Sequence, residues 1–215
     1  MEKFHAPPLL PPTAASLTEA ARVIRNGGVV AFPTETYYGL AVDPENRAAL
    51  ARLFRIKRRP PGKAVLVLAE NRSQLSSLIK DIPRIYNPLM ELFWPGPLTL
   101  VFPGRDHLSF LLTGNTATVG IRISSHPLAG RLVAAVGRPV TATSANISGE
   151  SPAVRAHEVA AQFGRGVDLV LDGGTTPGGA GSTVVGCDAT GRPYLIRAGV
   201  VPFAEVVAAL AALAE

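Results

Sequence analysis

Apolar residues recur along this chain in two patterns, and each pattern predicts a different kind of element. One face of a predicted helix carries residues at intervals of three and four: Leu50, Leu53, Phe54 and Lys57. Short unbroken apolar runs, such as residues 29–33, instead indicate buried strands. Because the two patterns alternate without repeats or low-complexity linkers, we expect an α/β fold with a sheet of mixed strand directions.

Local signals at the ends of these segments set the predicted boundaries. Ser16 and Glu19 have the spacing of a capping box, so we expect a helix that ends at Gly27 and Gly28. For the following helix we expect a cap at Asp43, with Pro44 in the first position and a stop at Pro60. Further predicted helices are 87–93, 127–136, 155–163 and 202–214, and further predicted strands are 64–69, 98–102, 118–123, 140–143, 167–171, 182–187 and 194–196.

The N-terminal segment differs from the rest, because four prolines surround Leu9 and Leu10. We expect residues 1–15 to form a flexible, proline-rich arm, and residues 16–215 to form the folded domain. This composition excludes a signal-peptide core, and no apolar run reaches the roughly 18 residues of a membrane helix. We therefore predict a cytoplasmic protein. Its one cysteine, Cys187, excludes an internal disulfide.

The distribution of charge is more informative than the net charge of +5. All but four of the 21 cations are arginine, which forms planar, bidentate contacts with phosphates and carboxylates. No acidic residue lies between Glu45 and Glu70, and seven cations gather there: Arg47, Arg52, Arg55, Lys57, Arg58, Arg59 and Lys63. Such a local positive field attracts nucleotides or nucleic acid, although a solvated helix face has the same composition.

Polar residues follow two predicted strands, and together with the cations they indicate an anion-binding cleft. Ser144 and Asn146 come after the strand at 140–143, and Thr34 and Thr36 follow the strand at 29–33. Hydroxyls, cations and an amide bind phosphates and neutralise developing charge, as nucleotidyl transfer requires. The sequence has no Walker motif and no Gly-x-Gly-x-x-Gly after a strand, and its histidines are isolated. These absences argue against a P-loop, a Rossmann site and a Ser-His-Asp triad.

Eight segments, in order along the chain, resemble the YrdC/TsaC family: Gly27–Leu40, Lys57–Pro60, Trp94–Thr99, Val119–Arg122, Ser144–Asn146, Asp172–Gly174, Ser182–Val184 and Leu195–Arg197. The resemblance implies a twisted, mixed parallel/antiparallel open sheet flanked by helices, with a large basic cleft. Residues 16–215 would be a YrdC-like catalytic domain in the compact, single-domain form. It also implies an L-threonylcarbamoyladenylate synthase, which joins L-threonine, bicarbonate and ATP and releases pyrophosphate. Its product would serve the threonylcarbamoyl modification of the tRNA adenosine next to the anticodon.

The resemblance further implies a role for each matching position. The catalytic pair would be Lys57 and Arg59, which grip the ATP phosphates, with Mg²⁺ bound to ATP and no metal ligands from the protein. The expected ATP contacts are Lys57, Arg59, Thr118, Ser144, Asn146, Ser151 and Arg197. The expected L-threonine contacts are Thr34, Arg122, Ser182 and the backbone of Ala142.

Two positions depart from the family pattern. Residues 65–68 contain no histidine, although some members supply a threonine contact there, and Ala198 replaces the usual proline after Arg197. Two other functions stay open on the residues alone. The basic segment would also suit a non-catalytic RNA-binding module, and a related carbamoyl-transfer module occurs in hydrogenase maturation. Whether the protein contacts tRNA or a tRNA-modification complex directly is left open by the sequence.

Overall fold

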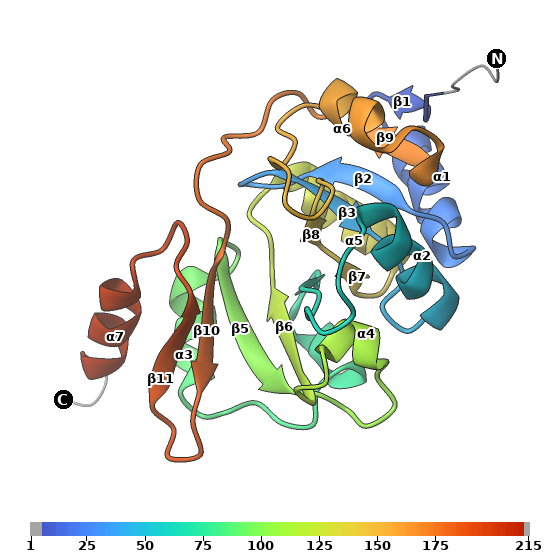
Figure 1. The fold of residues 1–215 in the computed structure, drawn as a ribbon. Coiled ribbons are helices and arrows are strands. Elements are labelled where there is room, and N and C mark those ends of the chain that lie inside the picture. The colour runs from blue at the N-terminus through green and yellow to red at the C-terminus, as the bar shows by residue number, and fades with distance from the viewer. Residues whose placement is uncertain (1–5, 213–215) are drawn as a thin grey trace.

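The computed structural model describes residues 6–212, whose strands form two sheets. The five-stranded sheet has the order β1 (Leu9–Leu10), β9 (Leu169–Leu171), β2 (Val30–Pro33), β3 (Tyr38–Ala41) and β8 (Thr143–Ser144). The six-stranded sheet has the order β11 (Pro193–Arg197), β10 (Thr183–Cys187), β5 (Leu98–Pro103), β6 (Thr118–Arg122), β4 (Val67–Leu68) and β7 (Val140–Thr141). Each sheet contains parallel and antiparallel strand pairs. The predicted mixed, helix-flanked architecture is therefore confirmed, and its strands are divided between two sheets (Figure 1).

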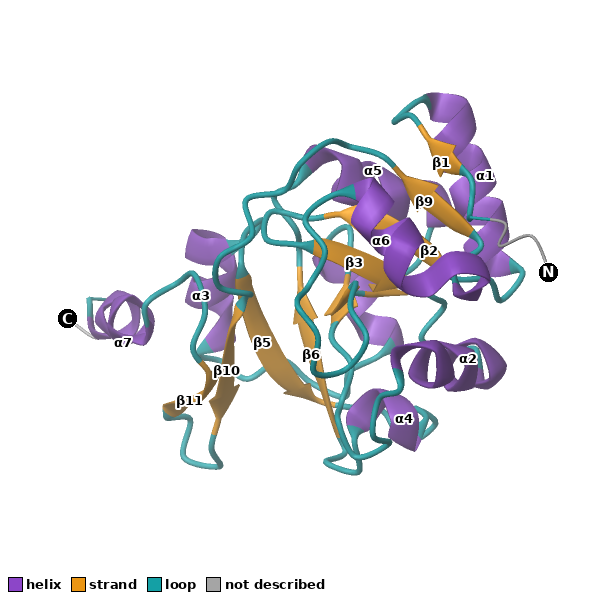
Figure 2. Cartoon of the chain, turned by 45° about the horizontal axis from the view of Figure 1, so that its top comes forward, coloured by secondary structure: helices purple, strands orange, loops and turns teal. Residues whose placement is uncertain are grey.

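Helices cover both faces of the five-stranded sheet (Figure 2). One face packs against α1 (Ala14–Arg25) and α5 (Pro127–Val136), and the other against α2 (Arg47–Lys57) and α6 (Ala156–Phe163). Alternation along the chain decides the packing, because successive side chains of a strand point to opposite faces. Val30 and Phe32 therefore join the cluster of α1 and α5, whereas Val29 and Ala31 join that of α2 and α6.

The six-stranded sheet is covered by α3 (Tyr86–Phe93) and α7 (Phe203–Ala211). Tyr86 stands edge-on to Phe102 of β5, with ring centroids 5.0 Å apart. The remaining short helices are α4 (Phe110–Thr113) and the 3-10 turns η1 (Arg72–Ser77) and η2 (Gly164–Gly166). The predicted helix at 202–214 extends beyond the described residues at 213 and 214. No helix within residues 6–212 is long and apolar enough to cross a membrane.

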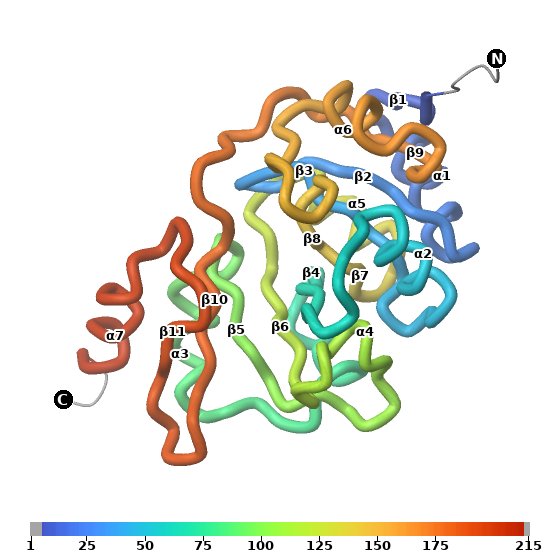
Figure 3. The backbone as a smooth tube through the Cα atoms, viewed as in Figure 1, coloured from blue at the N-terminus to red at the C-terminus, as the bar shows by residue number. Residues whose placement is uncertain are grey.

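Three connections pass between the two sheets, and each brings chemically useful residues to the gap. Residues 42–66 lead from β3 to β4 and contain α2 with the Lys57–Arg59 segment. Ala142 alone separates β7 from β8, and its N–H donates to the Leu66 carbonyl at 2.7 Å. Residues 172–182 lead from β9 to β10, as the tube in Figure 3 shows.

Two predicted helix caps were wrong. Thr13, not Ser16, caps α1, because its hydroxyl accepts the Ser16 N–H at 3.2 Å. Asn46, not Asp43, caps α2 by accepting the Ala49 N–H at 3.0 Å. Asp43 instead accepts the N–H of Glu45, so it turns the chain before the helix starts. In both cases a second capping residue nearby formed the bond, which spacing alone did not distinguish.

Several other boundaries also differ from the predictions. Helix α2 ends at Lys57, because Arg58 adopts a left-handed backbone with φ 49° before Pro60 is reached. The strand predicted at 64–69 shrinks to the two residues of β4. Part of the segment expected to be an arm pairs with the sheet, since Leu9 and Leu10 lie beside Val170 and Leu171. β3 was not predicted, because its glycine and hydroxyl-rich surroundings suggest a loop.

Candidate active site

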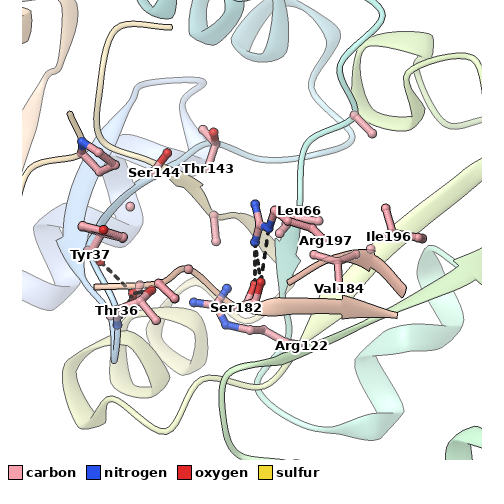
Figure 4. Close-up of a pocket in the computed structure, with 18 of the residues that line it drawn as sticks. Thr36, Tyr37, Leu66, Arg122, Thr143, Ser144, Ser182, Val184, Ile196 and Arg197 are labelled. Carbon is pink, nitrogen blue, oxygen red and sulfur yellow. Dashed lines mark hydrogen bonds between the residues drawn. The ribbon is translucent and has the colours of Figure 1, made fainter. Parts of the chain in front are cut away.

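A cavity of about 590 Å³ lies between the two sheets. β3 and β8 line one side, and β5, β6, β10 and β11 line the other. Its charged lining residues are the arginines Arg59, Arg122 and Arg197, and the lining includes no aspartate or glutamate. The remaining polar lining is rich in hydroxyls, and Figure 4 shows Thr36, Thr143, Ser144 and Ser182 among them.

Most of the residues predicted from the sequence meet in this cavity. The lining includes the following of them: Thr34, Arg59, Thr118, Arg122, Ala142, Ser144, Ser182 and Arg197. Three predicted ATP contacts, Lys57, Asn146 and Ser151, do not line it. These three lie on or beside the turn that follows β8, whose residue Ser144 lines the cavity.

The Lys57 side chain is buried, with 1% of its surface exposed. Its ammonium donates to the carbonyls of Ser144 and Asn146, the latter at 2.7 Å. Its own carbonyl accepts the N–H of Ser148 at 2.8 Å. Burial, with the nearby charge of Arg59, lowers the pKa of Lys57 to about 7. Lys57 therefore fastens the end of α2 to the turn after β8.

Asn146 holds the same turn from within. Its amide nitrogen donates to the carbonyls of Ile147 and Glu150, both at 2.9 Å. Its amide oxygen accepts the Ser144 hydroxyl at 2.6 Å. All of these bonds lie within residues 144–150, so Asn146 fixes the conformation of this turn. The turn forms the rim of the cavity that carries Ser144. The Ser151 carbonyl accepts a bond from Gln162, which ties the rim to α6.

Two of the three lining arginines are held by neutral acceptors. Arg59 donates to the Ala64 carbonyl at 2.7 Å, and Arg197 donates to the Ser182 carbonyl at 2.7 Å and to its hydroxyl at 3.0 Å (Figure 4). Within residues 6–212, neither guanidinium pairs with a carboxylate. Burial, then the charge of Arg197, lowers the pKa of Arg59, while burial, then the charge of Arg122, lowers that of Arg197. The cavity therefore holds two positive charges that an anion would stabilise.

The third arginine, Arg122, has a carboxylate partner. Its Nε donates to Oε1 of Glu35 at 2.9 Å, and the two side chains are 4% and 12% exposed. The Ser124 hydroxyl donates to the other carboxylate oxygen. Burial would raise the pKa of Glu35, but the charge of Arg122 and the hydrogen bond from Ser124 keep it below the ordinary value. Glu35 therefore offsets the positive charge of Arg122.

A tight turn between β2 and β3 supplies the hydroxyls opposite these arginines. The Thr34 hydroxyl donates to the Tyr37 carbonyl at 2.7 Å and lies 3.2 Å from the Thr36 hydroxyl. Tyr37 in turn donates through its phenol to the Gly179 carbonyl of the loop between the sheets. Since Thr34, Thr36 and Tyr37 all line the cavity, this turn joins one wall to the loop that crosses the gap.

Sequence reasoning missed Glu35 and Thr116. Glu35 is the one carboxylate in the segment after the strand at 29–33, which could have marked it as a partner for a nearby arginine. Thr116 lines the cavity with its hydroxyl 2.7 Å from that of Thr118. Thr116 lies in a bend before β6, where Ala117 has a left-handed backbone with φ 54°, so strand alternation in the sequence could not have indicated that the two hydroxyls meet.

The family model for Sua5, YciO and YrdC proteins, described as telomere recombination, matches residues 22–199. The chain belongs to this family. The threonylcarbamoyl-AMP synthases of Pyrococcus abyssi and Bacillus subtilis are each 40% identical to it, over 188 and 184 residues. These matches cover 87% and 85% of this chain but 55% and 53% of the two relatives, so the chain spans about half their length. The Chromohalobacter salexigens synthase is 38% identical over 75% of this chain and 86% of its own.

Solved structures in the Sua5/YciO/YrdC family share the fold. A crystal structure of P. abyssi Sua5 complexed with L-threonine has a TM-score of 0.85 and 38% identity, covering 90% of this chain and 56% of its own. E. coli YciO has a TM-score of 0.78 and 28% identity, covering 93% and 96%. The two-sheet arrangement is thus common to a longer relative and to one of similar length.

The Lys57 contacts generate a prediction about stability. Lys57→Met keeps the apolar stem but removes the donor, leaving the carbonyls of Ser144 and Asn146 without it. A buried acceptor left without its donor costs about 1–3 kcal/mol whether the lost donor was an ammonium or a neutral amine, so chemical denaturation should show a loss of that size. Exposed Arg55, on the same helix, is the matched control, and Arg55→Met should change stability by less than about 0.5 kcal/mol. Equal effects at both positions would contradict the anchoring role.

The pH dependence of this difference follows from the lowered pKa. Lysine has an ordinary pKa of 10.5, and in the folded protein burial lowers the pKa of Lys57 to about 7. Between these values the unfolded chain binds more protons, so stability rises with pH. The advantage of the wild type over Lys57→Met should therefore grow from pH 7 towards pH 10. A constant difference would mean that the two carbonyls keep the ammonium charged.

Proposed function

We propose that the protein is an L-threonylcarbamoyladenylate synthase. It would convert L-threonine, bicarbonate and ATP to L-threonylcarbamoyl-AMP and pyrophosphate, for the threonylcarbamoyl modification of the tRNA adenosine next to the anticodon. The observation that carries the proposal is a cavity lined by two arginines without a carboxylate partner within residues 6–212 and by a third, Arg122, that is paired with Glu35. The names of the relatives, and the L-threonine complex of P. abyssi Sua5, support the same reaction.

The unpaired arginines suit the nucleotide. Arg59 and Arg197 present positive charge with only neutral acceptors around them, and phosphates are the anions that arginine binds most specifically. Thr118 and Ser144 add hydroxyls on the same cavity. The turn after β8 sets the position of Ser144. We assign an indirect role to the residues that hold this turn, which are Lys57, Asn146 and Ser151. Arg59 is the residue we assign to neutralising the phosphates during the reaction.

The paired arginine suits the amino acid. Nε of Arg122 is used by Glu35, and within residues 6–212 no acceptor is bonded to its terminal nitrogens. These two nitrogens can hold a substrate carboxylate as a fork. Thr34 and Ser182 line the same region and would recognise the hydroxyl and amine of L-threonine, with the backbone of Ala142 beside them.

The lining chemistry limits the mechanism. The residues lining the cavity include no lysine, histidine, cysteine, aspartate or glutamate, so the lining offers neither a general base nor an activated nucleophile. This suits a reaction whose nucleophile is already an anion. We propose that L-threonine and bicarbonate first form N-carboxythreonine with loss of water. Its carbamate oxygen then attacks the α-phosphorus of ATP directly, and pyrophosphate leaves with the electrons of the broken P–O bond. Arg59 and Arg197 would stabilise the charge that develops.

We propose that ATP binds with Mg²⁺. Within residues 6–212, no three His, Cys, Asp or Glu side chains gather in a way that could hold a metal ion. The phosphate oxygens and water would then be the main ligands, which Mg²⁺ accepts readily. We further propose that the reaction takes place in the cytoplasm, where its product would pass to the tRNA-modification machinery.

The proposed reaction requires all three substrates. Pyrophosphate release from ATP should therefore depend on L-threonine and on bicarbonate, and should fall to background when either is omitted or when EDTA removes Mg²⁺. A coupled pyrophosphate assay with each component omitted in turn measures this. Release without threonine, or with carbamoyl phosphate in its place, would favour the hydrogenase-maturation reaction. RNA binding without any ATP turnover would favour the RNA-binding module.

The assignment of Arg59 predicts a local effect on catalysis. Charge-assisted hydrogen bonds contribute about 1.5–3 kcal/mol, so Arg59→Ala should lower kcat/KM by roughly ten- to a hundredfold. Arg55→Ala removes an exposed cation from the nearby end of α2 and should lower it by less than about threefold. Steady-state kinetics with ATP varied compares the two. Equal losses would mean that the basic segment acts as a diffuse field rather than through Arg59.

The assignment of Arg122 predicts a separation of the two substrates. Arg122→Lys keeps the charge but loses the planar fork, so the KM for threonine should rise by roughly tenfold. ATP affinity should stay nearly unchanged, because Arg59 and Arg197 remain in place. Separate titrations of threonine and ATP measure this. A fall in ATP affinity with threonine affinity unchanged would place Arg122 at the nucleotide end instead.

A further inference from the structure

The ion pair between Glu35 and Arg122 joins the two sheets. Glu35 lies on the turn between β2 and β3 of the five-stranded sheet, and Arg122 is the last residue of β6 in the six-stranded sheet. Ser124, just beyond β6, donates to the second carboxylate oxygen. The Glu35 carboxylate, on a turn of the five-stranded sheet, thus binds both Arg122 and Ser124 at the end of β6 in the six-stranded sheet.

This pair is also the most buried one within residues 6–212. Its side chains are 4% and 12% exposed, whereas those of Arg52 and Asp168 are 28% and 33% exposed and those of Arg138 and Asp43 are 51% and 10% exposed. A buried ion pair is seldom more stabilising than apolar residues of the same size. Stability alone therefore explains poorly why two charged side chains are buried here. A role in the site is the better explanation.

The Arg122 guanidinium can bind Glu35 and a substrate at the same time. Glu35 does not line the cavity, whereas Arg122 does. The bond at 2.9 Å uses Nε, on the side of the guanidinium that faces Glu35, and leaves the terminal nitrogens for the cavity. Because the guanidinium is planar, fixing Nε and its direction fixes the plane in which a substrate carboxylate must lie.

The charge balance supports the same division. Arg59 and Arg197 have no carboxylate partner among the described residues, whereas Glu35 offsets the charge of Arg122. A polyanion is therefore favoured beside Arg59 and Arg197, and an amino acid, which has no net charge, is accepted beside Arg122.

We propose that Glu35 is a positioning residue for the amino-acid substrate, which aims the Arg122 fork at the substrate carboxylate while tying the two walls together. The proposal rests on the proposed function, because it takes L-threonine as the amino acid. Glu35 itself touches no substrate and acts through Arg122.

The test compares binding of L-threonine and of L-threoninol, which has an alcohol where threonine has its carboxylate. Isothermal titration of the wild-type protein and of Glu35→Gln gives four dissociation constants. For Glu35→Gln we expect the value for L-threonine to rise by about ten- to a hundredfold, since a misaligned group loses affinity on this scale. The value for L-threoninol should change by less than about threefold, because it has no carboxylate for Arg122 to hold. ATP affinity should be unchanged.

Two controls separate positioning from general damage. Asp168→Asn breaks the ion pair with Arg52, which lies away from the cavity, and should lower the melting temperature without changing threonine affinity. Ser124→Ala removes one bond to Glu35 but keeps the ion pair, so it should have a smaller effect than Glu35→Gln. If Glu35→Gln loses its fold, Ser124→Ala and Arg122→Lys with the same two ligands still test the carboxylate dependence.

The outcomes separate this inference from the proposed function. Unchanged threonine affinity in a folded Glu35→Gln overturns the inference and leaves the proposed function intact. Equal weakening for threonine and threoninol also overturns it, since Glu35 would then support the site as a whole. A wild-type protein that binds no threonine, with or without ATP, overturns the proposed function together with the inference. Selective weakening for threonine supports both.

Discussion

The divergence of the two sheets at Ala142 is the constraint on which the site depends. Backbone groups where strands separate must still find partners, because an unpaired buried N–H or carbonyl is costly. Here the N–H groups of Thr141 and Ala142 donate to Val42 and Leu66, and that of Ala145 donates to Tyr38. These bonds reach both sheets from one short segment, so the chain changes sheets without leaving its backbone unpaired. The cavity lies between the two sheets beyond this point. The distance between its walls therefore depends on how the sheets separate at Ala142.

The second organising feature is the way in which positive charge is held near the cavity. Arg59 and Arg197 are fixed by carbonyl and hydroxyl oxygens rather than by carboxylates. Neutral acceptors set the position of a cation without cancelling its charge, so the field in the cavity is preserved for a bound anion. Only Arg122 is neutralised, by Glu35. The pattern of partners, more than the number of cations, distinguishes Arg122 from Arg59 and Arg197.

Sequence reasoning identified the fold class and most lining residues because these depend on local patterns. Continuous apolar runs marked β2, β5, β9 and β10, and α5 was placed at its observed bounds. The buried ammonium of Lys57 was not predictable in this way. Helical periodicity placed Lys57 on the packed face, but only the tertiary arrangement brings the carbonyls of Ser144 and Asn146 within reach, 87 and 89 residues later in the chain. The partners of Glu35 were not predictable from local spacing either, since Arg122 follows it by 87 residues. Spacing along one element predicts faces, whereas contacts between walls depend on how two sheets meet.

The position that lacks the histidine of some family members shows how one wall adapts. Leu66 lines the cavity, whereas its neighbours Val65 and Val67 are buried in the core, so alternation selects Leu66 as the inward residue. An apolar side chain there offers contact to a methyl group but no hydrogen bond. Under the proposed function, polar recognition of L-threonine must then come from the turn of Thr34 and from Ser182, and Leu66 would pack against the substrate methyl. Because the Ala142 N–H is bonded to the Leu66 carbonyl, this apolar contact is built into the same point at which the two sheets separate.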